Sequence, residues 1–177
     1  MSNIHENKNN ENYILKVLIE ISNIINRYNI YLITLSVAAM TTIVFTQVFM
    51  RFVLNNSLSW AEEISRFLMI WMCFLGSGVA SKEGEHIAVN IIFKALPTKI
   101  KPYVIFFTKI FILFFLGFCV WRGISMVQFV IRQKAPASQI SMAWAYGAVP
   151  VGCAIMFYHI FVSLFNCKKD TQGESIS

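Results

Sequence analysis

Residues 57–71 read SLSWAEEISRFLMIW, and this stretch decides how the chain must fold. Glu62, Glu63 and Arg66 stand at the head of a segment that is otherwise apolar enough to dissolve in lipid. An ionised side chain costs roughly 2.5–3.5 kcal/mol at the centre of a membrane helix and much less near its end. These three side chains must therefore lie at the membrane boundary, pair with one another, or dock against a partner.

The whole chain has the composition of an integral membrane protein. Of its 177 residues, 56% are hydrophobic and 14% are charged, and its mean hydropathy is +0.59. Soluble domains are about 45–50% apolar and about 25% charged. The net charge of +6 does not indicate nucleic-acid binding, because the basic residues stand at the ends of apolar segments instead of forming one stripe.

Four apolar segments are long enough to cross a bilayer, which takes about 20 helical residues. The sequence therefore predicts an all-α integral membrane protein with one four-helix domain over residues 13–166, flanked by disordered polar tails at 1–12 and 167–177. The expected spans cover residues 30–52, 59–81, 103–131 and 142–166.

Two shorter segments are predicted to form helices at the membrane surface. Residues 13–28 place apolar side chains on one helical face and polar ones on the other, which predicts an amphipathic helix in the interface or packed on the protein. The apolar centre of the connector between spans 2 and 3, residues 87–96, is too short to cross. We expect a short interfacial helix there, ended by Pro97.

The charged residues at the head of the second span have several possible roles. Ser59 and Glu62 match the S-x-x-E capping box that marks a helix start. Glu62 and Arg66 are one helical turn apart, in the order that favours an ion pair. Glu63 points about a quarter turn away and has no such explanation. A structural role, a subunit contact and a proton- or ion-coupling role remain open for this cluster.

Small residues and a proline mark places where helices can approach or bend. Gly76 and Gly78 lie near the end of the second span and would let a neighbouring helix come close. Pro150 interrupts the hydrogen bonding of the fourth span and permits a kink.

The distribution of basic residues predicts the orientation of the chain. Most lie in the termini and the long connector, and few lie in the two short loops. The positive-inside rule then puts the N- and C-termini in the cytoplasm and the Glu62, Glu63 and Arg66 cluster at the outer boundary.

Three other function classes fit these residues less well. His86 and His159 suggest the haem ligands of a cytochrome-like redox protein. The indication is weak, because two axial pairs of histidines are not available. A disulfide oxidase would need paired external cysteines. The cysteines of this chain are separated and lie in or at the end of apolar runs, at Cys73, Cys119, Cys153 and Cys167. A self-sufficient exporter would usually show internal repeats, and we find none.

An ordered set of residues resembles the small permease subunit of tripartite ATP-independent periplasmic (TRAP) transporters, the DctQ-like family. The resemblance runs from about Ile30 to Phe165 and includes the sequence RF at 51–52, SLSW at 57–60 and VPVG at 149–152. The residues that we expect to form subunit contacts or to support the structure are Arg51, Trp60, Glu62, Glu63, Arg66, Trp71, Gly76, His86, Tyr146 and Pro150.

This resemblance implies a subunit that is not an enzyme. In this family a periplasmic substrate-binding protein captures an acidic organic solute, such as a C4-dicarboxylate or a sialic acid. A large multi-span permease subunit then carries the solute inward by an elevator-like motion that a sodium gradient drives. The small subunit would sit in the bacterial inner membrane and enlarge the fixed scaffold. It would hold no cofactor, because the sodium ions would bind the large subunit.

Overall fold

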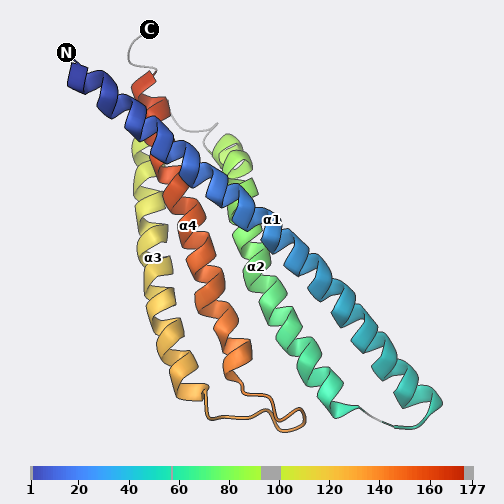
Figure 1. Cartoon of the computed structure of the whole chain (residues 1–177). Coiled ribbons are helices and arrows are strands. Elements are labelled where there is room, and N and C mark those ends of the chain that lie inside the picture. Colours follow the sequence, from blue (N-terminus) through green and yellow to red (C-terminus); the bar gives the residue numbers. More distant parts are fainter. Residues whose placement is uncertain (1, 57, 93–100, 174–177) are drawn as a thin grey trace.

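Four helices make up the part of the chain that the computed structural model describes, which is residues 2–56, 58–92 and 101–173 (Figure 1). Side chains are described for residues 16–56, 58–83 and 104–164. The helices are α1 (Ser2–Val53), α2 (Ser59–Ile92), α3 (Lys101–Val130) and α4 (Ala143–Gly173).

Each helix contains a segment long and apolar enough to cross a membrane, which confirms the predicted all-α, four-span architecture. Short loops join α1 to α2 and α3 to α4 at one end, whereas α1 begins and α4 ends at the opposite end (Figure 1). We call these the loop end and the terminal end of the molecule. The candidate spans are Lys16–Val53, Ser59–Glu83, Val104–Val130 and Ala143–Leu164.

The amphipathic segment at residues 13–28 is not the separate helix that the sequence suggested, because α1 is continuous from Ser2 to Val53. That stretch contains neither glycine nor proline, and an existing helix gains one hydrogen bond for each residue that it adds. The same reason accounts for a helix over residues 2–12 and for the extension of α4 to Gly173, where disordered tails were expected.

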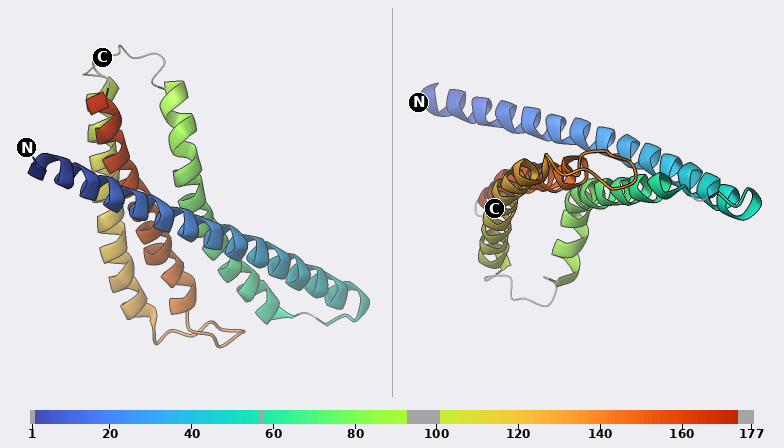
Figure 2. Two further views of the ribbon diagram at one scale, coloured as in Figure 1. Left: turned by 45° about the horizontal axis from the view of Figure 1, so that its top comes forward. Right: turned by 90° about the horizontal axis from the view of Figure 1, so that it is seen from below.

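The length of α1 requires that it tilt or extend beyond the hydrocarbon core. Its 38-residue candidate span is about 57 Å long at 1.5 Å per residue, whereas the hydrocarbon core is about 30 Å thick. The left view of Figure 2 shows α1 crossing the other helices obliquely. A helix this long also places its first turns well outside the core of the bilayer.

The second helix also runs further than expected. It ends at Ile92, so residues 87–92 continue α2 instead of forming a separate helix, and Pro97 lies outside the described residues. Figure 2 shows the last turns of α2 (light green) pointing in a different direction from its first part. Ser77 and Ser81 donate to carbonyls one turn earlier, and such bonds favour bending of a helix.

Helix α4 is the centre of the packing, with α3 and α2 against it and α1 against α2. A core cluster of Leu116, Cys153 and Ile160 joins α3 to α4. A Cβ added to Gly152 would lie 2.6 Å from Cβ of Phe74, so only glycine allows α2 and α4 this contact. The helix continues through Pro150.

Candidate functional site

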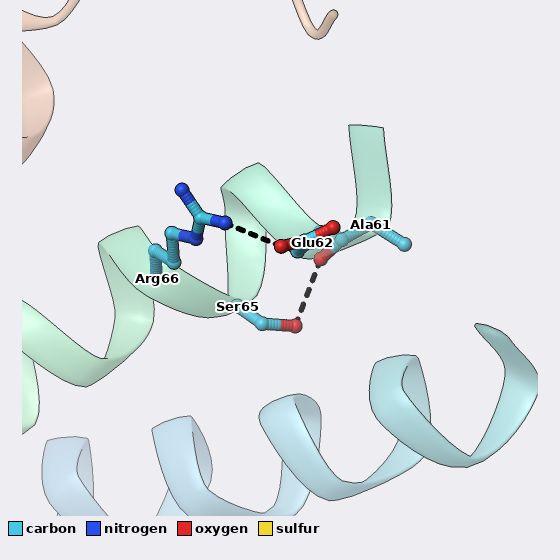
Figure 3. Close-up of polar contacts among 4 residues, drawn as sticks. All are labelled: Ala61, Glu62, Ser65 and Arg66. Carbon is cyan, nitrogen blue, oxygen red and sulfur yellow. Dashed lines mark hydrogen bonds and ion pairs between the residues drawn. The ribbon is translucent and has the colours of Figure 1, made fainter. Parts of the chain in front are cut away.

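The ion pair that the sequence predicts at the head of α2 is present. Arg66 donates from Nη2 to Oε1 of Glu62, one helical turn earlier (Figure 3). The two side chains are 66% and 57% exposed, and exposed pairs of this kind contribute about 0–1 kcal/mol to stability. The pair therefore does little to hold the fold, and its charges remain available at the surface.

The capping box expected at Ser59 and Glu62 does not form among the described residues. Helix α2 begins at Ser59, and the N–H of Ala61 donates to the carbonyl of Leu58 at 3.1 Å. That bond makes Leu58 the residue in the capping position. The Glu62 carboxylate is engaged by Arg66 instead of reaching back to the helix start.

Glu63 has the structural partner that the sequence did not reveal. Its Oε1 accepts the N–H of Ala137 at 3.0 Å, and its Oε2 accepts the N–H of Ser138 at 2.8 Å. Both donors lie at the tip of the loop between α3 and α4. A carboxylate that accepts two backbone N–H bonds makes charge-assisted hydrogen bonds, which are stronger than neutral ones. Glu63 therefore fastens this loop to the N-terminal part of α2.

The loop that Glu63 holds, residues 131–142, is itself ordered by backbone hydrogen bonds. The N–H of Ala135 donates to the carbonyl of Ile140, and that of Met142 donates to Gln133, both at 2.9 Å. Gln139 has a φ of 57°, which turns the chain back toward α4. The tip that meets Glu63 is thus a compact hairpin and not an open connection.

A second contact fixes the start of α4 near the same end. Nε1 of Trp71 donates to the carbonyl of Trp144 at 2.9 Å. This carbonyl lies in the first turn of α4, while the Trp144 side chain itself is 67% exposed. Trp60 and Tyr146 are also exposed near this end of the molecule, where aromatic side chains commonly lie at a membrane boundary.

The remaining predicted residues are not part of this group. Arg51 is exposed at the end of α1, 5.9 Å from the centre of the Phe52 ring. A Cβ added to Gly76 would meet no atom within 4 Å, whereas one at Gly78 would lie 3.0 Å from Cγ2 of Ile155. Within the described part of this chain, the predicted close approach is therefore present at Gly78 and absent at Gly76, and a subunit contact at Gly76 stays a prediction. The side chain of His86 lies outside the described residues.

Polar contacts that the sequence analysis missed tie α1 to the bundle toward the terminal end. Ser22 and Nδ1 of His159 are hydrogen-bonded at 2.8 Å, and His159 is only 3% exposed. The Tyr158 hydroxyl donates to the carbonyl of Leu18 at 3.2 Å. Ser22 and Asn29 are both buried and lie two turns apart, a spacing that could have marked this face of α1 in the sequence.

A search with models of protein families matches residues 40–169 to the DctQ component of tripartite ATP-independent periplasmic transporters. The match covers well over half of the chain. The chain belongs to this family. The small TRAP permeases are transporter subunits and not enzymes, as the resemblance predicted, and the redox alternative receives no support from the comparisons.

Individual relatives agree with the family match. The sialic acid TRAP transporter small permease protein SiaQ of Vibrio cholerae is 27% identical over 140 residues, which are 79% of this chain and 81% of the relative. A putative TRAP transporter small permease protein of Haemophilus influenzae is 24% identical over 144 residues, which are 81% of this chain and 87% of the relative.

Some relatives are much longer than this chain. The sialic acid TRAP transporter permease protein SiaT of Haemophilus influenzae is 28% identical over 123 residues, which are 66% of this chain but only 19% of SiaT. A region similar to the small TRAP permease therefore also occurs within a larger permease polypeptide.

Proposed function

We propose that this small TRAP permease subunit forms a fixed wall in the membrane, against which a large permease subunit moves its solute. The observation that carries this proposal is the exposure of α1. No residue in its most apolar 18-residue window is buried inside the chain. Large side chains of the α1 candidate span, such as Leu35, Phe45 and Phe52, are 67–76% exposed. A surface of this kind suits contact with lipid on one side and with a membrane partner on another.

The longer relatives support a large permease as that partner. In SiaT, and in the isethionate TRAP transporter permease protein DctMQ of Oleidesulfovibrio alaskensis, the region similar to this chain makes up 19% and 17% of the polypeptide. Joining two units in one polypeptide fixes a high effective concentration of one for the other. In this chain the same association would form between separate subunits.

The hydrogen bonds at the loop end suit a subunit that stays fixed during transport. Glu63 fastens the α3–α4 loop to α2, and Trp71 fastens α2 to the start of α4. Three helices are thereby connected at one end by hydrogen bonds in addition to their packing. A wall that resists being dragged with a moving neighbour needs connections of this kind.

We further propose an inner-membrane orientation with both termini in the cytoplasm, a sodium gradient as the driving force, and delivery of an acidic organic solute by a periplasmic binding protein. The basic residues in the termini and connector support the orientation. Relatives named for sialic acid and C4-dicarboxylate transport support the solute class. The sodium ions would bind the large subunit, and this chain would need no cofactor.

Reconstitution of the three components in liposomes tests this proposal. Uptake should require this chain, the large permease, the binding protein and an inward sodium gradient. Omission of this chain should abolish uptake while leaving solute binding by the soluble protein unchanged. Uptake by the large permease and binding protein alone, at the full rate, would contradict the proposed role.

A further inference from the structure

A pocket of about 660 Å³, lined by charged, amide and apolar side chains, lies between α1 and α2, away from the Glu63 contact. Its lining comes from one stretch of α1 and from one residue of α2. We propose that this pocket binds the phosphate of a phospholipid headgroup. The lining residues are Glu20, Asn23, Ile24, Asn26, Arg27, Ile30, Tyr31 and Lys82.

Helical spacing gathers the α1 side chains of the pocket on one face. Glu20, Asn23, Arg27 and Tyr31 follow one another at intervals of three or four residues. Residues at these intervals are neighbours on a helix surface. The pocket is therefore a continuous strip along α1, and Lys82 of α2 closes it from the side.

The two cations of the pocket are placed differently. Lys82 is held in position, because its Nζ donates to Oδ1 of Asn23 at 2.6 Å. Arg27 is exposed one turn further along α1, and among the described residues it makes no ion pair. An ammonium fixed on one helix and a free guanidinium on the next suit an anion that accepts several hydrogen bonds, as a phosphate does.

The pocket lies at the depth of a headgroup. Lys82 is the penultimate residue of the α2 candidate span, which ends at Glu83. Its bond to Asn23 brings this part of α1 to the same level, at the terminal end of the molecule. Basic pockets between membrane helices at this depth are suited to lipid headgroups.

The composition of the lining favours a lipid phosphate over free phosphate. Two cations and one carboxylate, Glu20, leave a net charge of +1 that matches the single negative charge of a phosphodiester. Inorganic phosphate carries more negative charge at neutral pH, so Glu20 would repel it more strongly than it repels a phosphodiester. Ile24, Ile30 and Tyr31 are 43–67% exposed beside the cations and offer an apolar surface to the glycerol and acyl chains.

Lipid titration of the purified full-length chain in detergent micelles, read by native mass spectrometry, tests this site. The probes are dioleoyl phosphatidylglycerol, dioleoylglycerol, which lacks the phosphate, and inorganic phosphate as a competitor. Phosphatidylglycerol should bind to the wild-type chain. Binding should weaken by about tenfold or more in the R27Q/K82Q variant, because both charge-assisted contacts are lost.

A matched control removes the same charge elsewhere. The R122Q/R132Q variant loses two exposed cations outside the pocket and should bind phosphatidylglycerol within about twofold of the wild type. The R27K variant retains the charge and should keep most of the binding, which separates loss of the site from loss of the fold.

Three results of the lipid titrations would overturn the proposal, and a fourth comes from the phosphate competition. These are unchanged binding in R27Q/K82Q, equal binding of dioleoylglycerol, and a loss of equal size in R122Q/R132Q. Displacement of the lipid by low-millimolar inorganic phosphate would show a site for soluble phosphate and would also overturn it.

Discussion

Oε2 of Glu63 lies 2.8 Å from the backbone nitrogen of Ser138, although 75 positions separate these residues in the sequence. The N–H of Ala137 donates to the other oxygen of the same carboxylate at 3.0 Å. One acidic side chain therefore joins the N-terminal part of α2 to the tip of the loop between α3 and α4, at the end where both short loops lie (Figure 1).

Replacement of Glu63 by glutamine should loosen the loop tip. Glutamine keeps the size of the side chain but turns one acceptor into a donor, which would face a backbone N–H. Hydrogen exchange of the Ala137 and Ser138 amides should accelerate by about tenfold, because both lose a charge-assisted bond. Glu62→Gln is the matched control, since among the described residues Glu62 bonds only to Arg66. Equal exchange in the two variants would argue against the contact.

Trp71→Phe should destabilise the attachment of α4 to α2. The variant retains an aromatic ring but loses the N–H that donates to the carbonyl of Trp144. The free energy of unfolding should fall by about 1 kcal/mol, measured by denaturant titration in detergent. Trp144→Phe leaves that carbonyl in place and changes an exposed ring, so it should have a smaller effect. The reverse order would refute the assignment.

Gly152→Ala should force α2 and α4 apart. The added Cβ would lie 2.6 Å from Cβ of Phe74 and 3.0 Å from its carbonyl oxygen, neither of which can move without the backbone. A loss of about 1–3 kcal/mol in thermal unfolding is expected. Gly147→Ala in the same helix would meet no atom within 4 Å and should be neutral or stabilising by up to about 1 kcal/mol. A neutral Gly152→Ala would contradict this packing.

Ser22→Ala should weaken the attachment of α1 to α4. The buried His159 would lose the partner of its Nδ1, which is 2.8 Å from the Ser22 hydroxyl. The expected loss is about 0.6–2 kcal/mol, since bonds between membrane helices average near the lower value. Ser36→Ala removes a hydroxyl whose bond in the described part of the chain stays within α1, to the carbonyl of Leu32, and it should change stability little. Cysteine crosslinking between α1 and α4 would report the same difference.

Arg66→Ala should separate stability from assembly. The Glu62–Arg66 pair is exposed, so the free energy of unfolding should change by no more than about 0.5 kcal/mol. Association with the large permease, or uptake in the reconstituted system, should decrease if these charges meet a partner. Full uptake and full co-purification would remove the case for a contact role of Arg66.

The sequence was sufficient for the number and approximate position of the membrane helices. Their apolar length is a local property, and so is the spacing that pairs Glu62 with Arg66. Local pattern was less informative about helix ends. The amphipathic character of residues 13–28 suggested a separate helix, but nothing in α1 interrupts its hydrogen bonding.

The partner of Glu63 could not be predicted, because it is a pair of backbone amides distant in the sequence. Any residue except proline can supply an N–H, so the side chains at positions 137 and 138 give no signal. The contact of Ser22 with His159 was hidden for a similar reason, since it depends on how α1 crosses α4. Tertiary arrangement decides both.

The Glu63 contact also has a consequence for how this region can change in evolution. Backbone amides are present whatever the side chains are, so the residues at the loop tip can vary without loss of the bonds. One inserted or deleted residue between Ala135 and Ile140, however, would move the amides out of reach. Homologues that retain the acid should therefore tolerate substitutions in this loop but not insertions or deletions, and the constraint would show as a conserved loop length.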